Sequence, residues 1–224
     1  MKSLLESLLD DFEDIEKSQD NRQEVVQFLK ENYYRFSYMD IFEHFKVSDK
    51  PNRRGKYEVK WIIKYQPCEP INKELKQLTN GMFVFTGGYF MIRNLKRLEN
   101  LEGFSKKFKG SIHLIGNDML TSLEGAPEEI TLGDFKCISC HGLKTLEGAS
   151  VKINGDCVIK GCPKLTSLKG APKFIKGIFD ITDNKSLKSL EGCPESITTL
   201  YCNDDFNKED IKKYCHPLKI IIAK

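Results

Sequence analysis

The sequence predicts an α+β protein in which a parallel β-solenoid follows a small helical, α+β region at the N-terminal end. The first observation is a leucine pair with the spacing Leu-x-x-Leu, which recurs at steps of 22, 23, 22 and 22 residues. The second is a short segment of alternating apolar and polar residues ahead of each pair. Because one such coil cannot bury its apolar side alone, a fixed period of this length indicates stacked coils that share a core. The pairs are Leu98 and Leu101, Leu120 and Leu123, Leu143 and Leu146, Leu165 and Leu168, and Leu187 and Leu190.

The alternating segments are predicted to be half-buried strands, because side chains along a strand point to opposite faces with a period of two. Strands of neighbouring coils are expected to lie parallel, about 4.8 Å apart. The first set of side chains expected to point inward is Tyr89, Ile112, Phe135, Cys157, Phe179 and Leu200. The second set is Met91, Leu114, Cys137, Ile159, Ile181 and Cys202.

A polar or thiol side chain follows each strand at the turn toward the leucines. An Asn there can hydrogen-bond the backbone of the adjacent coil, whereas a Cys fills the interior and is a weaker donor. After the leucines comes a Gly, in three coils followed by Ala or Cys and then Pro, which disfavours a helix. We therefore expect extended or 3₁₀ backbone on that side of each coil. The turn column is Asn94, Asn117, Cys140, Cys162 and Asn184.

An apolar strand, an Asn or Cys, and then spaced leucines is the layout of a leucine-rich repeat. The strings GDFKCISCHGLKTLEGAS, LTSLEGAPEEI and LTSLKGAPKFIKGIFDITDNKSLKSLEGCPESI resemble the short repeats, 22 to 23 residues long, of mostly uncharacterised proteins from bacteriophages and gut bacteria. The lead-in NGMFVFTGGYFMIRNLKRL is similar to the segment that opens such arrays. This resemblance covers about residues 80–204 and implies a solenoid with a binding role and no catalytic residue. The chain departs from the family's usual Asn at Cys140 and Cys162.

The flanks of the repeat array are not repetitive. The predicted organisation is an N-terminal α+β cap over 1–68, a connecting helix and the first strand of a hairpin over 69–87, the solenoid over 88–204, and a C-terminal cap over 205–224. Apolar stripes and capping signals predict helices over 5–15, over 20–33 and from Ser37 to Phe45, and a short helix around 73–78. Strict alternation predicts a strand over 57–65. The C-terminal cap is expected to be a helix over 207–214 and a strand over 218–222.

Composition excludes several classes of protein. The chain carries 35 basic and 32 acidic residues, a net charge of +3, which argues against a surface devoted entirely to nucleic acid. It has no run of 18 apolar residues, so no membrane partner or span is expected. The acidic start MKSLLESLLDDFEDIE does not look like a signal peptide. We therefore expect a cytoplasmic protein, in the cytoplasm of the host cell if a phage encodes it.

The eight cysteines are expected to stay reduced and free of metal. A zinc site built from Cys137, Cys140, Cys157 and Cys162 is the alternative. The repeat phase favours the first interpretation, because each thiol falls in an inward or turn column, and only one Cys-x-x-Cys pair is present. Cys193 takes the place of an Ala in the earlier coils. No cofactor is expected.

The sequence predicts a protein-binding module and not an enzyme, because its histidines do not converge with other reactive groups in any recognisable motif. The outward strand positions vary from coil to coil, and several are apolar, which is typical of a contact surface. The residues expected to bind a partner are Phe90, Ile92, His113, Ile115, Lys136, Ile138, Val158, Lys160, Asp180 and Tyr201, with Ile115 and Ile138 in the middle. In one alternative, residues 1–68 fold over this face. In two others, the chain associates with nucleic acid through the basic segment 46–64, or is a structural or assembly component.

Overall fold

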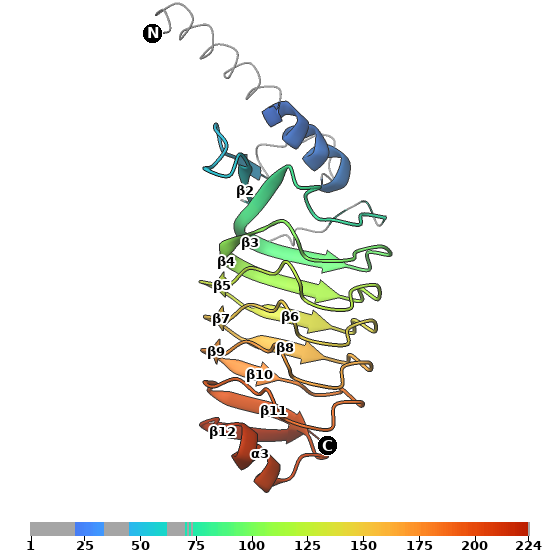
Figure 1. Cartoon of the computed structure of the whole chain (residues 1–224), viewed down its shortest axis with the longest axis vertical. Coiled ribbons are helices and arrows are strands. Elements are labelled where there is room, and N and C mark those ends of the chain that lie inside the picture. Colours follow the sequence, from blue (N-terminus) through green and yellow to red (C-terminus); the bar gives the residue numbers. More distant parts are fainter. Residues whose placement is uncertain (1–20, 34–44, 62–69, 71, 73, 224) are drawn as a thin grey trace, which may run out of the picture.

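Most of the chain is a parallel β-solenoid, in which successive coils stack along one axis (Figure 1). The structure is a computed structural model that describes residues 21–33, 45–61, 70, 72 and 74–223. In its main sheet the strands follow one another in the order β1-β2-β3-β4-β6-β8-β10-β11-β12. Neighbours pair in parallel, except that β1 and β2 are antiparallel. The strands are β1 (Phe45–Val47), β2 (Tyr57–Trp61), β3 (Phe83–Arg93), β4 (Phe104–Ile115), β6 (Phe135–Ile138), β8 (Cys157–Lys160), β10 (Ile178–Asp180), β11 (Thr199–Asn203) and β12 (Lys219–Ala223).

A second, narrower sheet forms the opposite side of the coils. Its strands β5 (Glu129–Ile130), β7 (Lys152–Ile153) and β9 (Phe174–Ile175) pair in parallel with one another, and β5 also pairs with the first half of β4. The backbone here is therefore extended, one of the two forms expected for this side. Each strand ends in a buried Ile five residues after the coil's Gly, and Ile197 repeats this position in the next coil.

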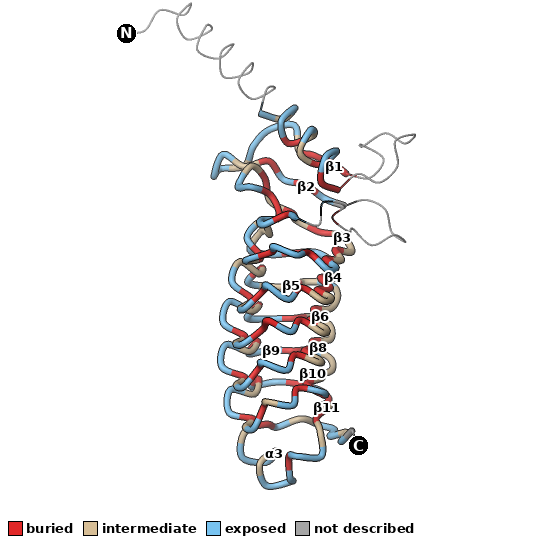
Figure 2. Tube along the Cα trace, turned by 90° about the vertical axis from the view of Figure 1, so that its right-hand side faces the viewer, coloured by how far each residue is buried: buried red, intermediate tan, exposed pale blue. Residues whose placement is uncertain are grey.

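The core lies between the two sheets, and buried residues recur at the same places in successive coils (Figure 2). All ten leucines of the Leu-x-x-Leu pairs are buried, as predicted. From β4 onward both inward columns are also buried as predicted, from Ile112 and Leu114 to Leu200 and Cys202. Stacking therefore produces one continuous core along the solenoid.

Buried asparagines join adjacent coils at the turn. The side-chain oxygen of Asn117 accepts a hydrogen bond from the Leu95 N–H (3.0 Å), and its nitrogen donates to the Ile92 carbonyl (2.9 Å). Asn184 bonds the Cys162 N–H and the Ile159 carbonyl in the same way, at 2.8 and 2.7 Å. The two coils between them carry Cys140 and Cys162, whose thiols lie 3.7 and 3.6 Å from the carbonyl oxygens two residues earlier. The ladder thus has amides at both ends and thiols in between.

The register of β3 differs from the prediction by one residue. Tyr89 pairs with Ser111 and Phe90 with Ile112, after an irregularity between Phe85 and Gly87. Since a slip of one residue turns every side chain to the other face, Phe90 and Ile92 are buried, and the prediction that they point outward is wrong. Tyr89 and Met91, predicted to point inward, lie on the outer face and are half-buried.

The same slip affects the turn that follows β3. Leu95 occupies the register position opposite Asn117, whereas Asn94, predicted for that column, is exposed with a φ of 51°. A close backbone contact accompanies this register. The backbones of Gly88 and Gly110 approach so closely that a β-carbon on Gly110 would overlap the Gly88 carbonyl. This contact requires Gly at residue 110.

The N-terminal end of the solenoid is covered by a helix over residues 21–33, as predicted from its capping signal (Figure 1). Val25, Leu29 and Tyr33 are buried, and the Tyr33 hydroxyl donates to the Leu78 carbonyl at 2.7 Å. Phe28 packs edge-on against Phe83 of β3, with ring centroids 5.7 Å apart. This helix therefore closes the first cross-section of the core.

Other predictions for the N-terminal region are partly wrong. Phe45 begins strand β1 instead of ending a helix. Residues 74–78 form turns and bends instead of a short helix. Phe83 begins β3, which is parallel to both of its neighbours, so there is no hairpin there. The helix predicted over 5–15 and most of the one predicted from Ser37 lie outside the described residues.

The C-terminal end has the predicted helix and strand. Helix α3 (Lys208–Tyr214) is capped by the Asn207 side chain and buries Ile211, and β12 extends the main sheet. The sheet thus continues beyond 88–204 at both ends, through β2 and β12. Cys193 and Cys215 form a disulfide across one coil, with α-carbons 5.6 Å apart. The prediction that all cysteines stay reduced is wrong for this pair.

Candidate functional site on the outer face of the main sheet

The outer face of the main sheet carries two columns of side chains between β3 and β11. Register places eight of the ten predicted contact residues on this face. Phe90 and Ile92 are excluded from it, because both are fully buried in the core. The first column is Met91, His113, Lys136, Val158, Asp180 and Tyr201. The second contains Arg93, Ile115, Ile138 and Lys160.

The centre of this face is apolar. Ile115 of β4 pairs with Ile138 of β6, and Val158 of β8 is paired with Lys136 in the adjoining column. All three apolar side chains are half-buried although they face away from the core. The helix over 21–33 lies at the end of the stack (Figure 1), so within the described part of the chain this centre has no cover. An uncovered apolar cluster on a rigid sheet is typical of a contact surface.

His113 lies beside the apolar centre and is only 8% exposed. Its Nδ1 lies 2.8 Å from the Tyr89 hydroxyl, while its Nε2 is buried with no hydrogen-bond partner among the described residues. Burial lowers the pKa of this imidazole from 6.5 to about 4, and the Lys136 cation adds to the effect while Asp134 opposes it. The ring is therefore neutral at pH 7.

Charged and polar groups form the margin of the face. Lys136 lies 3.4 Å from the Asp134 carboxylate, and Lys160 lies 3.2 Å from that of Asp183. The Thr182 hydroxyl donates to Asp180 at 2.7 Å, and Thr182 is buried. These contacts order the margin in advance. An apolar centre inside a polar margin is the usual anatomy of a protein interface.

Among the inner thiols of the central coils, those of Cys137 and Cys157 are held in the protonated form. Hydrogen bonding with the thiols of Cys140 and Cys162, together with burial, raises the pKa of Cys137. Burial likewise raises the pKa of Cys157. Protonated thiols are poor metal ligands. Within the described ranges no cluster of three or more side chains is arranged to hold a metal ion.

The basic segment forms the end of β1, the following turn and β2, and it lies away from the apolar centre, near the N-terminal end of the sheet (Figure 1). Tyr57 is buried, as its alternation with charged residues predicted, whereas Glu58 and Lys60 are exposed. No described helix is both long and apolar enough to cross a membrane.

Sequence reasoning missed Tyr89 and Met91 as members of the outer face. The only available signal was the pair Gly87-Gly88, since glycine inside a strand often marks an irregularity or a close backbone approach. A glycine pair of this kind indicates that the register of the strand can shift, but it does not show which side chains then face the core. Comparisons of the chain with protein families, with curated proteins and with solved structures found no match.

Proposed function

We propose that this chain is a leucine-rich-repeat solenoid that binds another protein through the outer face of β4, β6, β8, β10 and β11 and catalyses no reaction. The observation that carries the proposal is the contrast between the two faces. The inward columns hold only apolar or thiol side chains, whereas the outer columns change from coil to coil among apolar, basic, acidic and aromatic residues. A stacked backbone is already ordered, so binding costs little further entropy.

The chemistry of the face indicates what kind of partner it fits. A partner would place an apolar side chain against Ile115 and Ile138. Around that contact it would meet Lys136 in the adjoining column, Lys160 on the next strand and Asp180 on the strand after that. Charge complementarity at such a margin mainly sets partner choice and association rate, while the apolar centre supplies affinity.

The test uses two variants of the same chemistry on opposite sides of the molecule. Ile138→Asp places a charge in the apolar centre. Val151→Asp makes the same kind of change ahead of β7 on the other side, where Val151 is 47% exposed. Each tagged protein is used to capture partners from cells of the source organism, followed by mass spectrometry and binding measurements with the purified partner.

A protein that is retained by the unaltered chain and by Val151→Asp, but lost with Ile138→Asp, supports the proposal. Ile138→Asp is expected to lower the free energy of unfolding by less than about 1 kcal/mol, because the side chain faces away from the core. Equal capture by both variants would show that the partner binds elsewhere. Unfolding of Ile138→Asp would place this residue in the core and contradict the assignment of the face.

A further inference from the structure

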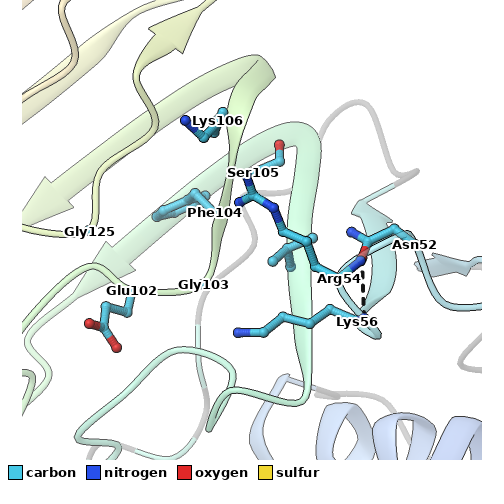
Figure 3. A pocket seen from close by; sticks show the side chains of 10 residues that line it. Asn52, Arg54, Lys56, Glu102, Gly103, Phe104, Ser105, Lys106 and Gly125 are labelled. Carbon is cyan, nitrogen blue, oxygen red and sulfur yellow. Dashed lines mark hydrogen bonds between the residues drawn. The ribbon is translucent and has the colours of Figure 1, made fainter.

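A pocket separate from the outer-face centre lies at the N-terminal ends of β2, β3 and β4. It has a volume of about 540 Å³ and opens between the turn before β2 and the first residues of β4 (Figure 3). Pockets of about 300–1,000 Å³ are the usual size for small-molecule ligands. Arg54 and Lys56 reach into this space from the turn, and Phe104 and Lys106 approach from β4.

The pocket is strongly biased toward positive charge. Its lining includes Arg54, Lys56 and Lys106 but only one carboxylate, that of Glu102. Lys106 is neutralised by an ion pair with Glu128. Arg54 and Lys56 form no ion pair with any residue in the described part of the chain. Arg54 and Lys56 therefore outnumber the one carboxylate in the lining, that of Glu102, and the resulting net positive charge favours a bound anion.

The turn that carries these cations is well ordered. The side-chain oxygen of Asn52 accepts hydrogen bonds from the backbone N–H groups of Arg54 (3.0 Å) and Lys56 (3.2 Å). The Asn52 N–H also donates to the Lys56 carbonyl at 2.8 Å, and Gly55 supplies the left-handed residue of the turn with a φ of 71°. Because its oxygen is engaged, the Asn52 side chain presents its NH₂ group as the remaining donor. The backbone that carries Arg54 and Lys56 is thus ordered before any ligand arrives.

Part of the lining is apolar. Val84 of β3 and Phe104 of β4 are half-buried and contribute to the pocket wall. The Phe104 ring is held in place by Phe90 and Phe108, each with its centroid 5.2 Å away. A rigid aromatic side chain next to two cations suits a ligand that combines an anionic group with a flat apolar part.

We infer that this pocket binds a nucleotide unit, with its phosphate on Arg54 and Lys56 and its base against Val84 and Phe104. A guanidinium matches phosphate oxygens with two parallel N–H bonds, and Lys56 adds a second positive charge. The ligand chemistry is that of a phosphate ester of a nucleoside, which can be a free nucleotide or one residue of a single-stranded nucleic acid. The site is separate from the proposed protein-binding face, because it uses other side chains and lies at the beginning of β4, whereas His113 and Ile115 lie at the end of that strand.

The test measures binding of AMP, ATP and a fluorescein-labelled ten-nucleotide oligouridylate to the full chain, by calorimetry and fluorescence anisotropy. The double variant Arg54→Gln/Lys56→Gln removes both unpaired cations. The control Lys164→Gln/Lys185→Gln makes the same change in net charge at two exposed lysines of distant turns. The first variant is expected to weaken binding at least about tenfold, because each lost charge-assisted contact is among the stronger polar interactions. The control should bind within about twofold of the unaltered chain.

The two sources of the nucleotide are separated by the probes. Tighter binding of the oligouridylate than of ATP, with an affinity that falls steeply with salt, assigns the site to nucleic acid. Equal or tighter binding of AMP or ATP assigns it to free nucleotides. Absence of binding by every probe at millimolar concentration, or unchanged affinity in the double variant, would overturn the inference.

A conservative variant tests the guanidinium while keeping the positive charge at residue 54. Arg54→Lys keeps the charge but loses the two-pronged hydrogen bond, so it is expected to fold normally and to bind more weakly than the unaltered chain. Thermal unfolding of all variants establishes that their folds are intact. If Arg54→Lys folds and binds with unchanged affinity, the guanidinium does not hold a phosphate.

Discussion

The central coils and the two ends of the solenoid meet the same requirement in different ways. Between β4 and β11 each coil lies between two similar neighbours, and a repeated set of leucines, isoleucines and thiols fills the shared interior. An end coil has a neighbour on one side only, so repetition cannot cover its core. The N-terminal end uses a helix and a cluster of aromatic rings, and the C-terminal end uses helix α3 and a disulfide.

The aromatic cluster shows how different the N-terminal end is. The ring of Phe85 lies 4.6 Å from that of Phe90 and 5.5 Å from that of Tyr33, measured between centroids. In the coils from β6 onward, the column that continues from Phe90 also holds smaller side chains such as Cys157 and Leu200. In the central coils, the repeated residues of one coil pack against the equivalent residues of the next. At the two ends, the core is covered by residues that do not belong to the repeat.

The largest effect is expected from the position at which the predicted and observed faces of β3 disagree. Phe90→Ala should lower the free energy of unfolding by about 3–5 kcal/mol, because it leaves a cavity in the aromatic cluster. Met91→Ala, one residue along, should cost far less, because Met91 lies on the outer face. Urea unfolding of both variants checks this, and a larger cost for Met91→Ala would restore the register expected from the repeat.

Reducing the disulfide tests how much it stabilises the C-terminal end of the solenoid. Loss of the Cys193–Cys215 bond should lower the free energy of unfolding by about 2–4 kcal/mol, because the reduced chain gains entropy when unfolded. Thermal unfolding with and without dithiothreitol measures the effect, and a Cys193→Ser/Cys215→Ser variant should not respond to the reductant. Intact mass without reductant should be two hydrogens lower than with it. An unchanged mass would show that the bond does not form.

The turn ladder allows the amide and thiol positions of the central coils to be compared. Asn184→Ala should cost about 1–3 kcal/mol, since it leaves the Cys162 N–H and the Ile159 carbonyl buried without their side-chain partner. Cys140→Ala should cost less, because its thiol makes only weak contacts, with the Ile138 carbonyl at 3.7 Å and with the Cys137 thiol. Equal losses in chemical denaturation would mean that the thiols connect the coils as strongly as the amides do.

The smallest effect is a dependence of stability on pH at His113. Its folded-state pKa of about 4 lies below the ordinary 6.5, so the unfolded chain takes up this proton first as the pH falls. The contribution of the neutral imidazole is fully present above pH 6.5, declines between 6.5 and 4, and is lost below that range. The difference in unfolding free energy between pH 7 and pH 5 should be larger for the unaltered chain than for His113→Gln, by on the order of 1 kcal/mol. Identical pH profiles would contradict the burial argument.

Much of the solenoid could be predicted from the sequence, because the same pattern of residues recurs in each coil. The leucine pairs, the strands from β4 onward, the capped helix over 21–33 and the final helix and strand were all predicted from periodicity and capping. The short second sheet was only partly foreseen, although an Ile at a constant distance from each Gly marked it. Two-residue strands carry too little alternation to be recognised alone.

The candidate site likewise has one part that the sequence predicted and another part that it did not. From β4 onward the sequence placed seven half-buried contact residues and the buried His113 on the outer face, because period and alternation agree there. At β3 the repeat spacing and the observed register disagree, because the pairing with β4 shifts between Phe85 and Gly87 and turns Phe90 and Ile92 inward. The disulfide between Cys193 and Cys215 and the convergence of Arg54 and Lys56 on a pocket also required the fold. Local sequence determined which residues alternate and repeat, whereas contacts between segments far apart in the chain determined register, pairing and cavities, since their partners are defined only in three dimensions.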